Sequence, residues 1–305
     1  MPIHPIPRVA VLALLAALAA CAAPALPFAR LSGLFTHSGL REISGLAASG
    51  AHPGVLWAIN DSGNPARLHA VSRRGRVLAS FRVEGARNVD WEDLASFSLD
   101  GKHYLLVADT GDNGGRRRSI VLHVFEEPAS LDGGVLRPAW SVQARWPDGP
   151  RDCEAVAVDA REGRILLVSK KRTPPELFSL PLGATPPGTD WPEPRRIGRL
   201  AGVPQPGAEL QRTDPVLARH YAQVTAADLS PDGRSLAVLT YGSVLFYRRG
   251  AGQDWGAAVS EPPIAHDVPL IPQAEALAWS TGGAGLYATG EFSPAPLFYL
   301  SPQLD

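Results

Sequence analysis

The chain has 305 residues, of which 45% are hydrophobic and 19% are charged, so it is a folded polypeptide with room for one large or two ordinary globular units. Its formal net charge of -1 gives no overall attraction for nucleic acid or anionic lipid, and we expect no nucleic-acid partner. The 30 glycines and 29 prolines exceed ordinary usage, and strand-forming runs are short and frequent, which favours an all-β fold with many turns.

Residues 1–20 have the pattern of a secretory signal peptide. Arg8 supplies a positive charge, and an apolar run rich in Leu and Ala extends from Val9 to Ala20. The end of this run, Leu18-Ala19-Ala20-Cys21, has the form of a bacterial lipobox. By that resemblance, Cys21 is lipidated and becomes the mature N-terminus. The alternative is an ordinary signal peptide with a chance cysteine.

A lipid on Cys21 would make a membrane the partner of the mature chain, with residues 21–27 as the lipidated cysteine and its tether. Ala22 follows the cysteine, where an Asp would indicate retention in the inner membrane. We therefore expect a place in the bacterial cell envelope, in the outer membrane and facing the periplasm. A multiply acylated cysteine anchors a domain firmly, since each buried methylene contributes roughly 0.8 kcal/mol.

Cys153 is the one cysteine that follows Cys21, so no intrachain disulfide can form in the mature chain. It alternates with the apolar residues of an expected strand, which predicts a small buried side chain. No histidine lies near it in the local sequence, which disfavours a catalytic thiol.

Residues 28–305 repeat one pattern, in which a polar residue opens a short apolar run, a tight turn follows, and a second apolar run ends in another polar cluster. The openings of the repeats are Ser44-Gly45-Leu46-Ala47, Asp90-Trp91-Glu92-Asp93-Leu94-Ala95, Glu154-Ala155-Val156-Ala157, Thr225-Ala226-Ala227-Asp228 and Glu275-Ala276-Leu277-Ala278. Most repeats offer four strand candidates, which is the composition of one propeller blade. The expected strands are 43–48, 55–59, 67–71 and 76–83; 92–98, 103–108, 120–125 and 140–146; 153–158, 164–168, 176–180 and 195–200; 224–229, 235–239, 244–247 and 264–268; 274–279, 285–288 and 296–300.

The fifth repeat lacks its outer strand, while the alternating run 28–35 has no repeat of its own. We therefore predict a single β-propeller domain over residues 28–305, with five four-stranded blades and the N-terminal strand completing the last one. The alternative has six blades, with a degenerate blade in the insertion 201–222. In that insertion, Asp214-Pro215 predicts the start of one short helix.

Gly-containing turns support this arrangement, because they recur between the first two strands of the repeats. They are Asp100-Gly101, Glu162-Gly163, Asp232-Gly233 and Gly282-Gly283. Glycine supplies the positive φ that a tight hairpin needs. One face of the propeller should therefore carry only tight hairpins, and we expect function on the other.

On that other face, the starts of the innermost strands meet the ends of the second strands around a central tunnel. Many acids would gather there and repel one another unless something neutralises them. The candidate metal ligands are Glu92, Asp109, Glu154 and Glu275. The candidate ligand-binding residues are Asn60, Asp61, Asp90, Asp112, Asn113, Asp152, Lys170, Lys171 and Glu291.

Three hypotheses explain the acids. A hard cation such as Ca²⁺ takes 6–8 oxygen ligands and would be held by the carboxylates. Alternatively, Lys170, Lys171 and Arg172 pair with the acids and no metal is needed. In the third, one carboxylate has a raised pKa and donates a proton beside an ionised partner. Asp61, Asp112 and Asn113 also suit turns, where Asp and Asn side chains bond their own backbone.

Five short motifs in a fixed order resemble those of the SdiA-regulated, YjiK-like bacterial domain family. They are Glu42-Ile43-Ser44-Gly45-Leu46, Glu92-Asp93-Leu94, Asp152-Cys153-Glu154-Ala155, Val224-Thr225-Ala226-Ala227 and Gln273-Ala274-Glu275-Ala276, with Asp109, Lys170 and Glu291 at second-strand ends. The resemblance implies a propeller with no assigned biochemical activity. The chain departs from the family in the loop 109–118 and in the insertion 201–222. It is more distantly similar to calcium-dependent propeller lactonases of the SMP-30 and paraoxonase type, which lack this motif order.

The sequence therefore predicts a membrane-anchored lipoprotein whose acid-lined mouth binds a divalent cation, calcium first, and a small-molecule, glycan or protein ligand. One alternative is a calcium-dependent hydrolase that uses the same carboxylates on lactones, esters, phosphoesters or glycosides. Another is a scaffold on which other proteins dock.

Overall fold

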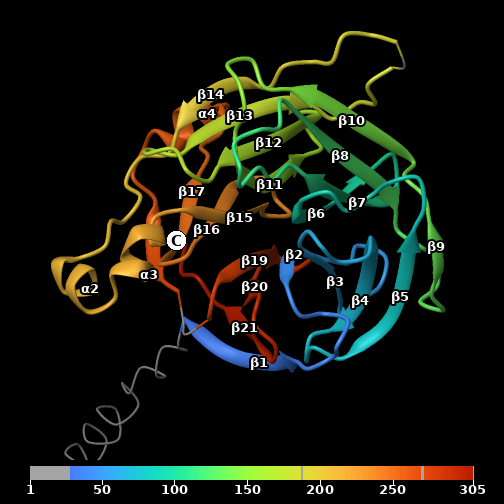
Figure 1. The fold of residues 1–305 in the computed structure, drawn as a ribbon, viewed down its shortest axis with the longest axis horizontal. Helices are drawn as coiled ribbons and strands as arrows, with labels where there is room; N and C mark the ends of the chain where they lie inside the picture. Colours follow the sequence, from blue (N-terminus) through green and yellow to red (C-terminus); the bar gives the residue numbers. More distant parts are fainter. Residues whose placement is uncertain (1–27, 187, 269–270, 305) are drawn as a thin grey trace, which may run out of the picture.

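The computed structural model describes residues 28–186, 188–268 and 271–304. Five sheets stand around a central axis as the blades of a β-propeller (Figure 1). The predicted five-bladed fold is confirmed, and the six-bladed alternative is wrong. The predicted signal peptide 1–20 and the predicted lipidated Cys21 with its tether 21–27 lie outside the described residues.

The blades follow one another along the chain, each from an inner to an outer strand. Blade 1 has β2 (Ile43–Ala48), β3 (Val55–Asn60), β4 (Arg67–Ser72) and β5 (Val77–Val83). Blade 2 has β6 (Trp91–Leu99), β7 (Lys102–Asp109), β8 (Ser119–Glu126) and β10 (Trp140–Arg145). Blade 3 has β11 (Cys153–Asp159), β12 (Arg164–Ser169), β13 (Glu176–Pro181) and β14 (Arg195–Arg199). Blade 4 has β15 (Val224–Leu229), β16 (Ser235–Thr240), β17 (Ser243–Arg248) and β18 (Ile264–Asp267). Blade 5 has β19 (Ala274–Trp279), β20 (Leu286–Gly290) and β21 (Ala295–Leu300), with β1 (Ala29–Phe35) as its outer strand.

The N-terminal strand closes the ring, as predicted. β1 pairs antiparallel with β21, from Ala29 opposite Leu300 to Phe35 opposite Ala295. The inner strands also contact one another in a complete circle, β2 to β6, β11, β15, β19 and back to β2. Closure therefore covers the outer edge of β21 and places every inner strand between two others.

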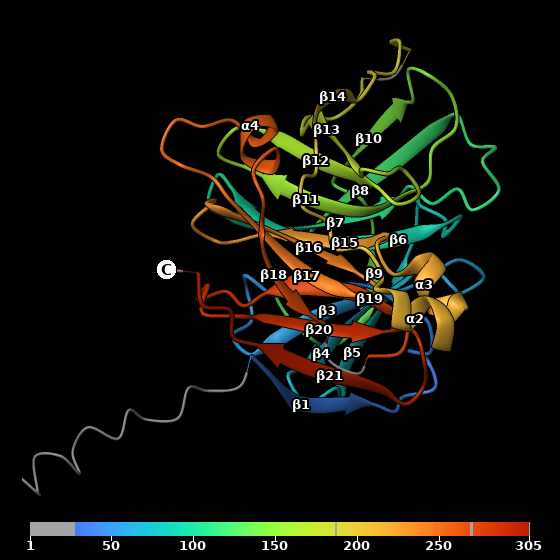
Figure 2. The same ribbon diagram turned by 90° about the vertical axis from the view of Figure 1, so that its left-hand side faces the viewer.

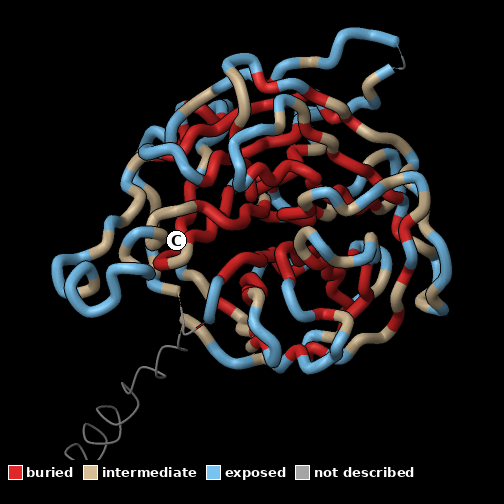
Figure 3. The backbone as a smooth tube through the Cα atoms, in the orientation of Figure 1, coloured by how far each residue is buried: buried red, intermediate tan, exposed pale blue. Residues whose placement is uncertain are grey.

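The core lies between the blades, because both faces of each inner strand pack on a neighbour. β2, β11 and β19 are buried along their whole length, whereas the outer strand β5 alternates between buried and accessible residues. Figure 3 shows this as a buried centre with exposed loops around it. Small residues make the close approach feasible: a Cβ on Gly45 would lie 2.7 Å from the Leu94 backbone nitrogen in blade 2.

The hairpin glycines behave as predicted. Gly101, Gly163, Gly233 and Gly283 have φ of 77°, 62°, 68° and 70°, which places them in the left-handed region that favours glycine. They lie between the first and second strands of blades 2 to 5, and the face that carries them is called the hairpin face below.

Some elements differ from the prediction. The insertion 201–222 contains two helices, α2 (Ala208–Thr213) and α3 (Pro215–His220), instead of one. Asp214 caps α3 by accepting a hydrogen bond from the Leu217 amide at 2.9 Å, as its sequence suggests. A short strand, β9 (Gly134–Leu136), adds to β5 in parallel, and α4 (Trp255–Val259) covers blades 3 and 4.

The two insertion helices stand beside the propeller, at the end away from the C-terminus (Figure 2). The Gly242 amide donates a hydrogen bond to the Tyr221 carbonyl at 3.0 Å, so the insertion contacts the loop that follows β16. Among the described residues, no helix is long and apolar enough to cross a membrane.

Two buried aspartates join the blades across the axis. The Asp93 carboxylate accepts hydrogen bonds from the amides of Leu94, Val156 and Ala227, so it ties together the inner strands of blades 2, 3 and 4. Asp228 accepts from the Leu229 and Trp279 amides and ties blade 4 to blade 5. The two carboxylates therefore link the inner strands of blades 2 to 5 in the middle of the ring.

Candidate functional site

The residue that opens each repeat lies in a β-bulge. In all five blades, the register between the first two strands shifts by one residue at this position. The residues passed over are Ser44, Glu92, Glu154, Thr225 and Glu275. A bulge leaves one residue out of the ladder and re-aims its side chain. This shared geometry explains why the polar residues tolerate a strand position and gather at one opening, called the mouth below.

The bulge residues divide into two kinds. Ser44 and Thr225 donate their hydroxyl hydrogen bonds to the carbonyls of Trp91 and Ala274 in the next blade, at 2.8 and 2.7 Å. The other three are glutamates, and all three are buried. The hydroxyls are therefore part of the frame, while the glutamates supply charge to the mouth.

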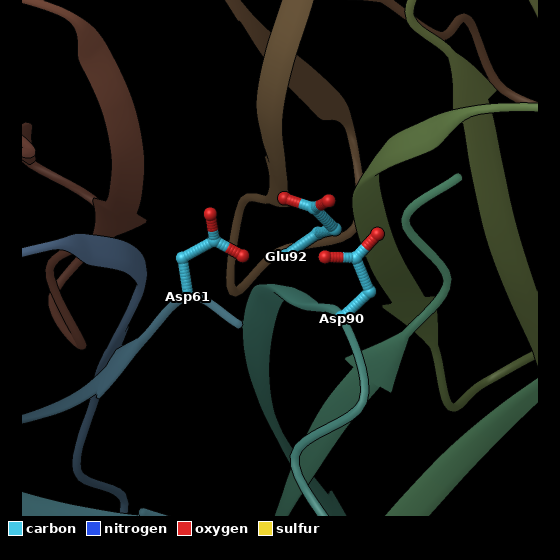
Figure 4. Close-up of side chains that lie close together, drawn as sticks. All are labelled: Asp61, Asp90 and Glu92. Carbon is cyan, nitrogen blue, oxygen red and sulfur yellow. The ribbon is translucent and has the colours of Figure 1, made fainter. Parts of the chain in front are cut away.

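Asp61, Asp90 and Glu92 form one acidic cluster. Each offers a carboxylate oxygen, and these atoms all lie within 4.8 Å of one another. Figure 4 shows the three carboxylates directed towards a common space from neighbouring blades. None of them forms a salt bridge in the part of the chain that the structure describes. Glu92 is 5% exposed, and its Oε1 atom has no hydrogen-bond partner there.

A second cluster contains Glu92, Asp152 and Glu154, whose carboxylate oxygens also lie within 4.8 Å of one another. Unlike the first cluster, it has lysine partners for two of its acids. Lys170 forms a salt bridge with Glu154, and Lys171 forms one with Asp152 at 2.7 Å. Two of the lysines predicted at the rim therefore neutralise two of the acids, as one of the sequence hypotheses proposed. That hypothesis does not account for the first cluster.

Blades 4 and 5 complete the ring around the mouth. The Tyr241 hydroxyl donates a hydrogen bond to Glu275, and the Lys170 ammonium group donates to the Tyr241 oxygen at 3.3 Å. Glu291 lies at the end of β20, where it accepts a hydrogen bond from the Gln273 amide group at 2.7 Å. Glu275 thus has a neutral partner, and it forms no salt bridge with a lysine in the described part of the chain.

Burial is the main cause that raises the pKa values of several mouth acids. It raises the pKa of Asp61 to about 6, with the charges of Asp90 and Glu275 adding to the effect. The pKa of Glu92 rises well above its ordinary value, through burial and the charge of Glu154. Burial and the charge of Glu275 raise the pKa of Glu291 to about 9. At neutral pH, protons or a cation must therefore neutralise part of the ring.

The pKa values of Glu154 and Lys170 also reflect the negative charge that gathers at the mouth. Burial raises the pKa of Glu154, the charge of Lys170 opposes this rise, and the charges of Glu275 and Asp152 add to it. Burial lowers the pKa of Lys170, but Glu154, Tyr241 and Glu275 outweigh it, and the net shift is upward. The lysine is therefore fully charged at neutral pH.

Several predicted site residues lie at the mouth but serve the loops around it. Asp112 accepts hydrogen bonds from the Arg116 and Arg117 amides at 2.7 and 2.9 Å, as in a turn. Asn113 accepts from Lys171 at 3.0 Å. Asn60 donates to the Gly39 carbonyl at 2.8 Å, and its own amide oxygen is buried without a partner in the described residues.

Asp109 lies outside both clusters. Its carboxylate forms a salt bridge with Arg117 at 2.8 Å and accepts hydrogen bonds from the Val89 and Asp90 amides. Asp109 therefore holds the segment that carries Asp90. It does not lie with the other candidate metal ligands.

Two features of the site were not recognised in the sequence. Gly111 packs so closely on the first cluster that a Cβ there would lie 1.9 Å from Glu92 Oε1 and 2.5 Å from Asp90 Oδ2. Asp93 and Asp228 are buried and accept hydrogen bonds from the amides of other blades. The other inner strands have a small residue at the position equivalent to Asp93, namely Gly45, Ala155, Ala226 and Ala276. The single acid at this position could therefore have been recognised from the sequence.

Cys153 is buried and free, as predicted. Burial raises the pKa of its thiol, so the sulfur stays protonated at neutral pH and is unsuited to nucleophilic attack.

Comparisons with known proteins add little to this description. No family model matches the sequence, and no curated protein matches it. A solved structure of the PQQ-bound form of aldose sugar dehydrogenase from Streptomyces coelicolor is similar over 92% of this chain and 99% of its own, with 12% identity and a TM-score of 0.47. At that level of similarity we draw no conclusion about ligand or activity, and the fold assignment depends on the sheet topology.

Proposed function

We propose that this protein binds one divalent cation, calcium by preference, between Asp61, Asp90 and Glu92, and that the cation helps to hold a small-molecule, glycan or protein ligand at the mouth. We also propose that it acts as a lipoprotein anchored through Cys21 and facing the periplasm. The resemblance to the YjiK-like family agrees with this proposal but assigns no activity.

The cation proposal depends on the Oε1 atom of Glu92, which is buried and has no hydrogen-bond partner among residues 28–186, 188–268 and 271–304. A buried carboxylate oxygen without a partner costs about 1–3 kcal/mol or more, so it calls for a cation or a proton. Two further carboxylates converge on the same space, and the nearby lysines are already paired with other acids. Three carboxylates with no nitrogen or sulfur donor suit a hard cation, and calcium adapts most readily to additional carbonyl and water ligands.

The first test measures thermal unfolding of the protein in EGTA and in calcium, magnesium or manganese chloride. We expect calcium to raise the melting temperature, because a cation that binds only the folded state stabilises it by mass action. Glu92→Gln should abolish the rise, and Glu193→Gln, an exposed control of the same chemistry, should retain it. An unchanged melting temperature of the wild type in every metal would contradict the proposal.

One observation also favours the hydrolase alternative. Burial and the charge of Glu275 raise the pKa of Glu291 to about 9, with a smaller contribution from Asp61, and this favours the protonated form at neutral pH. A neutral acid beside an ionisable one is the arrangement that general acid catalysis uses. Assays on chromogenic lactones, esters, phosphoesters and glycosides, with and without calcium, separate the two functions. Turnover that Glu291→Gln abolishes would establish the enzyme.

A further inference from the structure

The face of the propeller that carries the mouth also has a cavity of 340 Å³, beside the ring of acids. It lies between the loop 36–42, which joins blade 5 to blade 1, and the strands β4 and β5 of blade 1. Its volume lies within the range of small-molecule sites. Among the described residues, none that lines it is acidic. The cavity therefore differs from the mouth in the charge of the ligand that its wall would accept.

Two imidazole rings border this cavity. A Cβ on Gly39 would lie 3.1 Å from His37 Cε1 and 3.7 Å from His69 Cε1, so both rings lie against the same part of the loop. His37 is exposed, and its Nδ1 atom accepts a hydrogen bond from the Gly39 amide at 2.9 Å. This Nδ1 atom therefore has no proton of its own, and the ring carries its proton on Nε2. A protonated Nε2 atom cannot ligate a metal ion, but it can donate a hydrogen bond to an anion.

Arg67 adds a positive charge to the wall. It precedes His69 by two residues on β4, so both side chains leave the same face of the strand. Arg67 is exposed and forms no salt bridge among residues 28–186, 188–268 and 271–304. Burial lowers the pKa of His69 to about 4, and the positive charges of His37 and Arg67 add to this effect. His69 is therefore neutral at neutral pH, and the charges that act on it are positive.

The acids nearby are directed elsewhere. Asp61 follows a residue of the wall, but its carboxylate is directed towards the space that it shares with Asp90 and Glu92 (Figure 4). Glu42 accepts a hydrogen bond from the Asn64 amide group at 2.6 Å and does not line the cavity. The wall therefore offers a bound anion cationic and neutral donors and no carboxylate.

We propose that this cavity binds a phosphate group, either as the free ion or as part of a small phosphate monoester. The Arg67 guanidinium, which is a planar fork of donors, binds two phosphate oxygens, and His37 Nε2 donates to a third. Ser38, in the exposed loop, adds a hydroxyl donor. The cavity equals roughly 11 water molecules in the liquid, so a phosphate leaves room for a small organic group. The site uses no metal ion and none of the acids of the mouth.

The test is calorimetric titration of the whole protein, in EGTA and at neutral pH, with inorganic phosphate, glycerol phosphate and ribose phosphate. Glycerol and ribose are the counterparts that lack phosphate. We expect saturable binding of at least one phosphate probe and no binding of glycerol or ribose. Tighter binding of a monoester than of inorganic phosphate would identify an organic ligand, and the reverse order would identify the free ion. Because EGTA removes calcium, the result does not depend on the cation proposal.

Arg67→Gln should lower the affinity at least about tenfold, because it removes the charged donors of the wall. Arg76→Gln is the matched control, since Arg76 is exposed on the same blade, directly before β5 and outside the cavity. It should leave the affinity unchanged.

Ser38→Glu places a carboxylate at the cavity and provides a second variant, at an exposed position. It should also weaken binding at least about tenfold, whereas Ser38→Gln, of similar size but uncharged, should stay within about threefold of the wild type. The melting temperature of each variant in EGTA should match that of the wild type, which would show that the fold is intact. Absence of saturable binding by every phosphate probe overturns the proposal. Binding that survives both Arg67→Gln and Ser38→Glu, or that glycerol and ribose share equally, does so too.

Discussion

Glu92 shows how one residue can connect the fold to a function. The bulge takes it out of the strand ladder, burial removes its water, and Asp61 and Asp90 bring further negative charge to it. Glu154 has a comparable position but has Lys170 beside it. The difference between the two glutamates, one with and one without a cationic partner, identifies the part of the mouth where an external cation would bind.

Asp61 provides a prediction about pH. Its pKa is about 6 in the folded protein, whereas the unfolded chain releases the proton near 3.8. The folded state therefore binds more protons between these values, and the free energy of unfolding should fall as pH rises through them. Asp61→Asn removes this contribution, so the fall should be shallower in the variant. Urea titrations in EGTA at about pH 4.5 and about pH 6.5 measure the difference.

The control for this experiment is Asp132→Asn, at an exposed position outside the mouth. It should reproduce the pH dependence of the wild type. Calcium should reverse the destabilisation at the upper pH in the wild type, because it replaces the protons that the carboxylates lose. Equal pH dependence in Asp61→Asn and wild type would show that the Asp61 carboxyl is not desolvated in the folded protein.

The residues at the mouth were predictable to the extent that they follow the repeat. Glu92, Glu154 and Glu275 each open a strand, and equivalent strands of a propeller meet at one end. Which acid has a lysine partner was not predictable, since Lys170 and Lys171 are neighbours in sequence and could have turned to other acids. Asp109 was predicted as a metal ligand because its position at a strand end resembles that of Asp61. Its partner in the structure, Arg117, lies in a loop, and nothing in the sequence indicated that contact.

At the scale of elements, the loop 110–118 shapes the site because its backbone packs closely against the carboxylates of Glu92 and Asp90. Gly111→Ala should displace Glu92 and Asp90, because the added Cβ would lie well inside the contact distance of both carboxylates. We expect loss of most of the calcium-induced rise in melting temperature, with a destabilisation of about 1–3 kcal/mol in EGTA. Differential scanning fluorimetry with and without calcium measures the first effect, and urea unfolding measures the second.

Gly114→Ala is the matched control, since it lies in the same loop and the atoms nearest to its Cβ would be those of the flexible Arg116 side chain, from 3.7 Å. A calcium response of Gly111→Ala equal to that of the control would mean that the loop does not limit the site.

Loops were the least predictable elements of this chain. The two helices of the insertion bury no residue, so no apolar periodicity marked the first of them.

At the scale of the whole molecule, the ring depends on contacts between its first strand and blade 1. The Leu34 amide donates a hydrogen bond to the Arg74 carbonyl at 3.3 Å, and a Cβ on Gly33 would lie 2.3 Å from the Arg74 backbone. Gly33→Val should therefore push β1 away from blade 1 and lower the free energy of unfolding by about 1–3 kcal/mol. Chemical denaturation checks the loss.

Gly183→Val should leave stability nearly unchanged, because nothing lies within 4 Å of a Cβ at that position. If the two valine variants are equally stable, the contact between β1 and blade 1 does not help to close the ring.

The closure itself was predictable, because the first strand had no partner in sequence and the last blade lacked its outer strand. The parallel strand β9 was not, since three residues in an irregular stretch carry too little pattern.

The position of Ala29 has a consequence for orientation in the cell envelope. Ala29 pairs with Leu300, which in turn pairs with Leu286 beside the Gly285 turn, so the first strand enters at the hairpin face. A segment as short as residues 21–27 reaches at most about 25 Å when fully extended. If Cys21 is acylated, this short tether holds the hairpin face near the bilayer. The mouth, with its carboxylates, then faces the aqueous compartment. Solutes would then reach the mouth from the side away from the bilayer.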